Sequence, residues 1–482
     1  MTFTSIFTIS IFVINIFLAI IIVFIGRKSS SSTWAWLFVL LFLPVVGFIL
    51  YMLLGRNLRK KNFVRWRMLH EEEALDVFLK QKKKMQEDSF RFPNKITNNH
   101  QQLVQMNVDY NHAILTTHNH VDMIIDGKEK FRQVIADIEK AQNHIHMQYY
   151  IFKMDETGKS IYDALVKKAN EGVEVKVIYD DLGSRKLKKK HFQTLINAGG
   201  EVEAFFSTRF ALFNPRINFR NHRKLIIIDG KLGYIGGFNI GNEYAGLDKR
   251  FGYWRDTHLR ITGHSVYSMQ THFLFDWHQA GNIPFNSNRP EYFPKFVESS
   301  AIPIQIVSSG PDTAIESIKD SYIRMILTAK KYVYIESPYF IPDQAFLNAI
   351  RIAAASGVDV RVITPAKTDH PFVYGGNSAY GGDLLQYGGR LYRYDKGFLH
   401  AKMMVVDDEI CTIGTTNIDV RSFSLNFEIN AIIYDGDIAK KCRELFEQDL
   451  SNSFEVTREM YAQRSLWTRI RESVSRLLAP IL

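Results

Sequence analysis

The stretch Asn221-His-Arg-Lys-Leu-Ile-Ile-Ile-Asp-Gly230 contains the pattern His222-x-Lys224-x4-Asp229, and the stretch His400-Ala-Lys-Met-Met-Val-Val-Asp407 repeats it, with Lys402 in the place of Lys224. In both copies the apolar run between lysine and aspartate is typical of a buried strand. One match of this pattern has a chance expectation of roughly 0.05 to 0.1 per chain, so a single copy is a moderate signal. Two copies in register indicate a chain built from two related halves.

Three further pairs of segments repeat between the halves at matching positions. The first two pairs predict equivalent strands that follow helices, and the third pair predicts a Gly-rich turn that ends in Asn239 or Asn417 at the end of equivalent strands. The pairs are residues 144–152 and 332–340, 171–178 and 356–363, and 235–240 and 413–418. This repeat predicts an α/β fold of two duplicated domains, each a mixed β-sheet flanked by helices, related by a pseudo-twofold axis.

The chain has 482 residues, which leaves room for two domains of ordinary size after an N-terminal membrane segment. We expect a transmembrane hairpin over residues 1–55 and a charged juxtamembrane connector over residues 56–107. For the connector, a solvated helix is an equally good interpretation. The first catalytic domain is expected over residues 108–295 and the second over residues 296–482, ending in an amphipathic helix.

Two uncharged apolar segments, residues 3–25 and 33–54, open the chain. At about 1.5 Å per helical residue, the first is long enough to cross a hydrocarbon core of roughly 30 Å. A cleaved signal peptide is the alternative, but no basic residue precedes the first segment and a second apolar segment follows at once. Basic residues crowd the chain after the second segment: Arg56, Arg59, Lys60, Lys61, Arg65 and Arg67. This charge predicts a multi-pass protein of the cell membrane with its catalytic domains on the cytoplasmic side.

Charge and cysteine content limit the classes of partner. Lys and Arg number 60 against 50 Asp and Glu, a net charge of +10 that favours an anionic partner, either phospholipid or nucleic acid. Cys411 and Cys442 have no metal-ligand spacing and are too few for a disulfide framework. We therefore expect a reducing compartment and no structural zinc.

Histidine and lysine at the motif spacing suit attack on a phosphodiester. Neutral imidazole is available as a nucleophile near neutral pH. A lysine two residues further along a strand points from the same face, so it can bind the phosphate oxygens. Pairing the half-sites places His222 and His400 on opposite sides of one phosphorus, one to attack and one to protonate the leaving group. Neither half is expected to work alone.

The paired motifs and the string Asn417-Ile-Asp-Val-Arg-Ser-Phe-Ser-Leu-Asn-Phe-Glu428 resemble the phospholipase D superfamily, and more narrowly the bacterial cardiolipin synthases. The resemblance covers nearly the whole chain. It implies a phosphohistidine intermediate on one motif histidine, general acid and base catalysis by the other, and no metal or other cofactor. Family precedent favours His222 as the nucleophile and His400 as the acid and base, whereas the symmetry of the sequence leaves these roles interchangeable.

The resemblance also implies an acidic partner that orients each motif histidine, and Asp256 and Glu428 match those positions. Glu428 follows His400 by 28 residues, whereas Asp256 follows His222 by 34 residues. An insertion near residues 247–252 accounts for the difference, although it leaves Asp256 as the weaker match.

Other polar residues have two interpretations each. Asp229 and Asp407 are candidate catalytic residues, but a structural role at the strand ends is favoured. Asn239 and Asn417 fit phosphate binding and turn formation equally well. Residues 467–482 fit either an interfacial helix or one that packs on the catalytic domain. Four histidines outside the motif are interpreted as core or surface residues rather than metal ligands: His118, His120, His144 and His146.

These observations predict transfer of a phosphatidyl group between two phosphatidylglycerol molecules, which gives cardiolipin and glycerol. Membrane lipid is then the partner and nucleic acid is not, while the sequence leaves the oligomeric state open. A phospholipase D that transfers the group to water is the first alternative. A membrane-tethered nuclease is another, against which the hairpin argues. A catalytically silent lipid-binding protein is disfavoured because both copies keep His, Lys and Asp.

Overall fold

The computed structural model describes residues 3–24, 30–43, 45–47, 51, 72–206, 218–281, 289–296, 300–313, 315–367 and 370–479. The chain divides into two compact units. One contains Met1–Lys61 and Phe206–Phe219, and the other contains Asn62–Phe205 and Arg220–Leu482.

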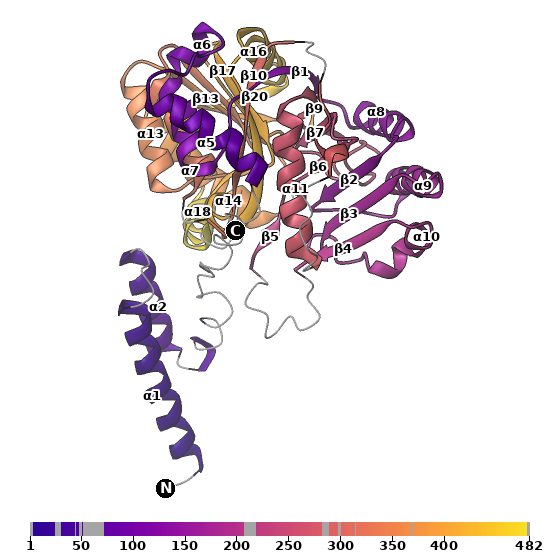
Figure 1. Ribbon diagram of the computed structural model, residues 1–482. Helices are drawn as coiled ribbons and strands as arrows, with labels where there is room; N and C mark the ends of the chain where they lie inside the picture. Colours follow the sequence, from indigo (N-terminus) through magenta and orange to yellow (C-terminus); the bar gives the residue numbers. More distant parts are fainter. Residues whose placement is uncertain are drawn as a thin grey trace. The chain divides into compact units, whose positions relative to one another are not determined.

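In the smaller unit, helices α1 (Phe3–Phe24) and α2 (Ser30–Phe42) pack side by side (Figure 1). Ile22 and Leu40 are buried between them, and the Asn15 side-chain amide donates to the Leu40 carbonyl at 3.3 Å. Helix α2 is shorter than the predicted apolar segment 33–54, much of which lies outside the described residues. Among the residues that are described, no helix combines the length and the apolar character needed to cross a membrane.

In the residues that the structure describes, the larger unit is built on one mixed sheet of 16 strands, 15 of them in one continuous order and one, β5 (Arg220–Asn221), paired with β19 beside it. Strands β1 and β10 pair antiparallel near its middle, and the same strand order runs outward from each of them. The first half runs β1 (Thr116–Ile124), β9 (His258–Gly263), β7 (Leu232–Gly236), β6 (Leu225–Ile228), β2 (His144–Tyr149), β3 (Glu174–Asp180) and β4 (Glu201–Phe205). The second runs β10 (Ile302–Ser309), β19 (Asn426–Ile433), β17 (Ile410–Gly414), β16 (Met403–Val406), β11 (Tyr332–Glu336), β13 (Asp359–Pro365), β14 (Arg390–Tyr394) and an added edge strand β20 (Ser453–Val456).

This order confirms the duplicated α/β architecture, because the first two segment pairs fall on β2 and β11 and on β3 and β13, and the third pair begins at the ends of β7 and β17. One detail of the prediction is wrong. The two halves do not have separate sheets, since the β1–β10 pair joins them into a single one. Direct hydrogen bonding between the halves fixes their relative position, which a site shared between them requires.

Helices cover the sheet in both halves. In the first half they are α8 (Gly127–Glu139), α9 (Glu156–Asn170), α10 (Gln193–Asn197) and α11 (Ser265–Gly281) (Figure 1). In the second half they are α12 (Ser317–Thr328), α13 (Gln344–Ala355), α14 (Pro371–Gln386), α15 (Val420–Ser424), α16 (Gly436–Leu450), α17 (Arg458–Ala462) and α18 (Leu466–Leu478). Asp155 and Asp343 cap the first turns of α9 and α13, each accepting a backbone hydrogen bond, as expected for equivalent helices.

In the described residues of the larger unit, three helices precede β1: α5 (Glu72–Gln86), α6 (Lys95–Asn99) and α7 (Gln101–Asn111). They come mainly from the predicted connector, but one face of α5 and one of α7 are buried in the core of the second half. Phe78 and Met85 from α5 and Leu103, Val104 and Val108 from α7 share that core with α12 and α13. The described part of the connector is therefore an integral layer of the second half.

Candidate active site

Two short strands carry the motif histidines across to the opposite half of the molecule. Strand β5 (Arg220–Asn221) pairs parallel with β19, and the backbone N–H of His222 donates to the carbonyl of Phe427 at 2.9 Å. Strand β15 (Gly397–Leu399) pairs parallel with β8 (Tyr253–Arg255), and the backbone N–H of His400 donates to the carbonyl of Arg255 at 2.7 Å. Each histidine therefore lies beside a strand of the other half.

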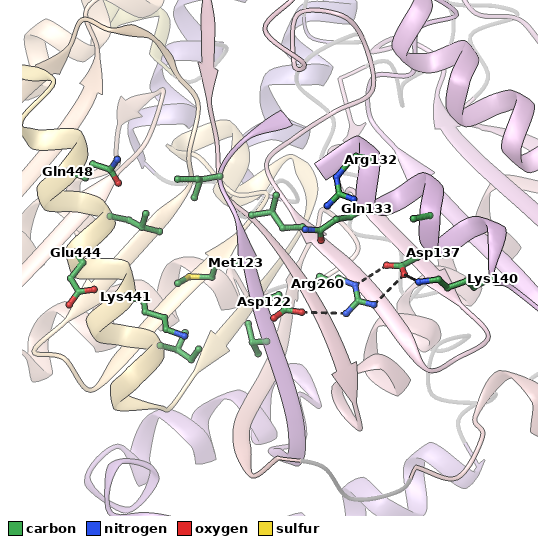
Figure 2. A pocket seen from close by; sticks show the side chains of 16 residues that line it. Asp122, Met123, Arg132, Gln133, Asp137, Lys140, Arg260, Lys441, Glu444 and Gln448 are labelled. Carbon is green, nitrogen blue, oxygen red and sulfur yellow. Dashed lines mark hydrogen bonds and ion pairs between the residues drawn. The ribbon is translucent and has the colours of Figure 1, made fainter. Parts of the chain in front are cut away.

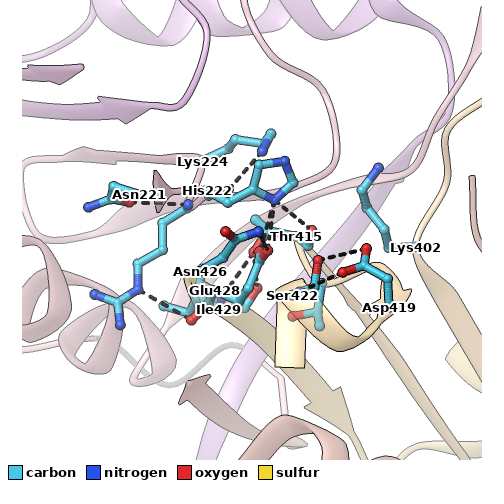
Figure 3. Close-up of polar contacts among 12 residues, drawn as sticks. Asn221, His222, Lys224, Lys402, Thr415, Asp419, Ser422, Asn426, Glu428 and Ile429 are labelled. Atoms are coloured by element: carbon cyan, nitrogen blue, oxygen red, sulfur yellow. Dashed lines mark hydrogen bonds and ion pairs between the residues drawn. The ribbon is translucent and has the colours of Figure 1, made fainter. Parts of the chain in front are cut away.

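The carboxylate facing His222 belongs to Glu428. His222 Nδ1 lies 3.0 Å from Glu428 Oε2 and 3.1 Å from the Thr415 carbonyl oxygen (Figure 3). Glu428 is fully buried, and it also accepts hydrogen bonds from Thr415 Oγ1 at 2.5 Å and from the Asn426 amide at 3.3 Å. This network fixes the plane of the imidazole and leaves its Nε2 for a substrate.

The carboxylate facing His400 belongs to Asp256. His400 Nδ1 lies 2.6 Å from Asp256 Oδ2, and the backbone N–H of Thr257 donates to Asp256 Oδ1 at 2.8 Å. In the sequence, the position of Glu428 was counted from His400 and that of Asp256 from His222. That counting implied that each histidine pairs with the carboxylate of its own half. That implied pairing is wrong, because both pairs cross between the halves.

The motif lysines are almost completely buried near the histidines. Lys224 Nζ donates to the His222 carbonyl at 2.7 Å. Lys402 Nζ lies 2.5 Å from the His400 carbonyl oxygen and 2.8 Å from His400 Nδ1. Two buried ammonium groups place positive charge in the site, which favours binding of an anion such as a phosphate there.

The electrostatics of the two half-sites are coupled. Burial lowers the pKa of His222, although Glu428 opposes the shift, and the lysines of both halves lower it further. Burial lowers the pKa of His400 to about 3, with Lys402 adding to the shift and Asp256 opposing it. Burial also lowers the pKa of Lys224 to about 7, and Lys402 adds to this shift while Glu428 opposes it. Because each lysine acts on the opposite half, the two motifs form one site.

The asparagines differ between the halves. Asn239 is buried; its Oδ1 accepts from the Ile151 backbone N–H at 3.1 Å and its amide donates to the Tyr244 hydroxyl at 3.3 Å. Asn417 Oδ1 is buried and, within the described part of the chain, has no hydrogen-bond partner. The structural interpretation therefore fits Asn239, and Asn417 is the better placed of the two for a ligand.

Asp229 and Asp407 lie at the far ends of strands β6 and β16 from the histidines. The Asp229 carboxylate accepts from the backbone N–H groups of Gln142, Asn143 and His144. Asp407 accepts in the same way from Lys330, Lys331 and Tyr332. Both have left-handed backbones, with φ of 53° and 57°. These contacts favour the structural interpretation of both aspartates, in which each carboxylate holds the loop that leads into the neighbouring strand of the sheet, β2 or β11.

Several residues of the site carry no motif signal in the sequence. The ring of Tyr150 contacts His222 edge-on at 4.9 Å between centroids, and the ring of Trp254 lies 5.0 Å from that of His400. Thr415 and Gly237 occupy equivalent places beside the two carboxylates. Thr415 donates to Glu428, whereas a Cβ at Gly237 would overlap the Asp256 carboxylate. The sequence repeat aligns Gly237 with Thr415, so it marks these two positions as equivalent.

The histidines outside the motif do not form a metal site in the described residues. His144 and His146 are buried and contact Gln270, and His146 stacks on Phe273 at 4.5 Å. His120 is exposed and pairs with Asp122 at 3.1 Å. They are the core and surface histidines that the sequence indicated.

A pocket of about 910 Å³ lies elsewhere, between α8, β1 and α16 (Figure 2). Its charged side chains are largely paired with one another: Arg260 contacts Asp137 at 2.8 Å and Asp122 at 3.4 Å. It contains no motif residue, and its lining has no nucleophile beside a base. The histidine site is therefore the stronger candidate for chemistry.

Comparisons with known proteins show the family to which the chain belongs. Residues 134–251 and 322–450 match the family described as cardiolipin synthase, PLD-like domain, and residues 13–56 match the phospholipase D-nuclease N-terminal family. The chain is 51% identical to the major cardiolipin synthase ClsA of Bacillus subtilis over the full length of both chains. It is 49% identical to a cardiolipin synthase of Listeria welshimeri, covering 98% of each chain. The crystal structure of phosphatidylserine synthase from Haemophilus influenzae has the same fold, with a TM-score of 0.59 at 16% identity over 81% of this chain and 100% of that one.

Two carboxylate-oriented histidines and two buried lysines on a duplicated sheet define an enzyme of the phospholipase D type. Within that class, the chain belongs to the cardiolipin synthase family.

Proposed function

We propose that this enzyme joins two phosphatidylglycerol molecules to give cardiolipin and glycerol. The observation that carries the proposal is the crossed pairing of His222 with Glu428 and His400 with Asp256, in a chain about half identical to two cardiolipin synthases. Two histidines with separate carboxylates supply a nucleophile and a separate acid and base, which a two-step transfer needs.

In the first step, His222 Nε2 attacks the phosphorus of one phosphatidylglycerol. The bond from phosphorus to the glycerol head-group oxygen breaks, and His400 gives that oxygen a proton, so glycerol leaves and a phosphohistidine forms. In the second step, a hydroxyl of another phosphatidylglycerol gives its proton to His400 and attacks the phosphorus. The phosphorus–His222 bond breaks and cardiolipin is released, which returns both histidines to their starting state.

Lys224 and Lys402 bind the non-bridging phosphate oxygens, with Asn417 as a further contact. Burial depresses the pKa of His400 most, and the lysine charges lower it further; the phosphate anion offsets those charges, which favours a proton on that histidine when lipid is bound. The chemistry uses side chains alone, with no cofactor. Both substrates and the product are membrane lipids, and nucleic acid is not a partner.

We further propose that the α1–α2 hairpin anchors the enzyme in the cell membrane, with the catalytic unit on the cytoplasmic side. The support is the uncharged stretch of residues 3–25 and the basic residues that follow the second apolar segment. Alkaline carbonate extraction of native membranes tests the anchor, since a spanning protein stays in the pellet. Protease added to sealed, right-side-out vesicles tests the orientation, because a cytoplasmic catalytic unit is then protected.

The activity is tested by incubating the full chain in mixed micelles with phosphatidylglycerol as the only lipid. Cardiolipin and glycerol in equal amounts are expected. Phosphatidic acid as the main product would make the enzyme a hydrolase, and no lipid product would overturn both functions. With phosphorus-labelled phosphatidyl-p-nitrophenol, whose leaving group departs without a proton, His400→Asn is expected to accumulate an alkali-stable label on His222, because the base for the second step is missing. A label on His400 in the His222→Asn variant instead would reverse the two roles.

A further inference from the structure

Helix α18 has the reverse of the usual arrangement for a helix on a protein surface. Such helices normally bury the apolar face and expose the polar one. In α18 the polar residues Glu472 and Ser475 are buried, with 5% and 0% of their surfaces exposed. Leu466, Trp467 and Leu477 are 72%, 80% and 81% exposed, and Ile470 and Val474 are 44% and 42% exposed.

Specific contacts hold the polar face of α18 against the catalytic unit. The Glu472 carboxylate accepts from Arg464 Nε at 2.7 Å, and the Arg476 guanidinium contacts Asp383 of α14 at 2.9 Å. Gly375 of α14 allows close approach, since a Cβ there would overlap Ser475 Oγ. A Cβ at Gly382 would likewise overlap the ring of Tyr461 of α17, so this glycine also allows close approach. The orientation of α18 is therefore fixed by packing, and its apolar stripe is directed away from the protein core.

The stripe follows the helical period over three turns, at residues 466, 470, 474 and 477, with Trp467 beside it. Exposed arginines border it, with Arg471 on one side and Arg469 and Arg476 on the other. The one acidic residue of α18, Glu472, points to the opposite, buried face. Exposed apolar residues with tryptophan at one end and a border of arginines match the interface of an anionic bilayer.

Helix α18 is also connected to the active site through α14, beside which it lies (Figure 1). Asn377 of α14 accepts from the Phe340 backbone N–H at 2.7 Å and donates to the Pro338 carbonyl at 2.9 Å. Strand β12 (Phe340–Ile341) pairs with β18 (Ile418–Asp419), directly after Asn417. A lipid surface that contacts α18 is thus one helix layer from the loop that carries Asn417.

We propose that the apolar stripe of α18 docks on the anionic lipid surface and sets the active site at the bilayer. This contact is separate from the N-terminal anchor and rests on the proposed function only for its effect on turnover. An anchor alone leaves the catalytic unit free to tilt, whereas a second contact beside the site restricts it. Lipid then enters from the membrane along the α14–α18 side.

A fluorescent label at position 477 tests the docking. The native cysteines are buried, so Leu477→Cys gives a single reactive thiol, and Ser160→Cys on exposed helix α9 is the matched control. The full chain is placed in nanodiscs at one copy per disc, made either with phosphatidylglycerol or with neutral phosphatidylcholine. The environment-sensitive nitrobenzoxadiazole label at position 477 is expected to shift to the blue and be quenched by lipids with a nitroxide near the head group, more strongly with phosphatidylglycerol. The label at position 160 should do neither.

Lack of quenching by lipid at position 477 overturns the proposal, whether the label is open to aqueous iodide or shielded by protein. A blue shift that depends on protein concentration in lipid-free detergent also overturns it, because a second copy then covers the stripe.

The double variant Trp467→Ser/Leu477→Ser should lower turnover several-fold in phosphatidylglycerol bilayers and leave it unchanged in mixed micelles. Equal loss in both would assign the stripe to folding. If wild type makes no cardiolipin, the proposed function fails while the label still reports docking.

Discussion

Nδ1 of His222, in the first half, lies 3.0 Å from Oε2 of Glu428, in the second half. In the reciprocal pair, Nδ1 of His400 lies 2.6 Å from Oδ2 of Asp256. The halves therefore complete each other: each provides one histidine and the carboxylate for the other. Since β1 and β10 join the halves in one sheet, both pairs depend on the same interface.

Removing the charge of either carboxylate should reduce turnover sharply. In Glu428→Gln and Asp256→Asn the amide no longer favours the required histidine tautomer or stabilises an imidazolium. We expect kcat to fall roughly 10²-fold or more in each variant. Steady-state rates in mixed micelles measure this, and thermal unfolding checks that the variants fold. A variant with a normal melting temperature and near-normal kcat would contradict the orienting role.

The equivalent positions Gly237 and Thr415 should respond differently to alanine. Gly237→Ala puts a methyl group where the Asp256 carboxylate lies, so His400 loses its partner and activity should fall at least tenfold. Thr415→Ala removes one hydrogen bond to the Glu428 carboxylate but leaves that carboxylate in place with its bond from Asn426, so a smaller loss is expected than in Gly237→Ala. Parallel kcat measurements compare the two, and a larger loss in Thr415→Ala would show that the half-sites are not organised as described.

Substrate binding should weaken as the pH rises past neutrality. The pKa of Lys224 is lowered to about 7, so its ammonium is charged below that pH and increasingly neutral above it. If the charged form binds the phosphate, KM rises above pH 7 by up to about tenfold per pH unit until substrate binding itself restores the proton. The profile of KM from pH 6 to 9 measures this.

Lys224→Arg is the matched control for the pH profile, because a guanidinium stays protonated throughout this range. Its KM should vary less with pH than that of wild type, even if its overall activity is lower. An equally steep rise of KM in Lys224→Arg would assign the pH dependence to another group.

The loop-holding aspartates should affect stability more than chemistry. Asp229→Ala and Asp407→Ala leave three backbone N–H groups each without their acceptor and place alanine at positive φ. We expect a loss of about 1–3 kcal/mol in the free energy of unfolding. The asparagine variants should lose less, because Asn tolerates this backbone and keeps an acceptor. Denaturant unfolding with kcat per folded enzyme tests this; full stability with abolished turnover would restore a catalytic role.

The local pattern of residue types along the sequence was sufficient to predict much of this architecture. The repeated motif identified the two halves, and the segment pairs fell on equivalent strands because a buried strand needs its own run of apolar residues wherever it lies in the fold. The chemistry that we propose for His222, Lys224, His400 and Lys402 was already suggested by the sequence, since it depends on residue type and on two-residue spacing along a strand. The roles of Asp229 and Asp407 were less readable, because a carboxylate suits both catalysis and the capping of backbone N–H groups.

The sequence by itself determined the duplication, the identity of the motif residues and the amphipathic pattern of residues 466–478. Only the tertiary structure decided that Glu428 serves His222 and Asp256 serves His400, because hydrogen bonds between β5 and β19 and between β15 and β8 join residues far apart in the chain. It also decided that α18 packs by its polar face. Periodicity places apolar residues on one side of a helix, but the partner surface, here the glycines and Asp383 of α14, selects which side is buried.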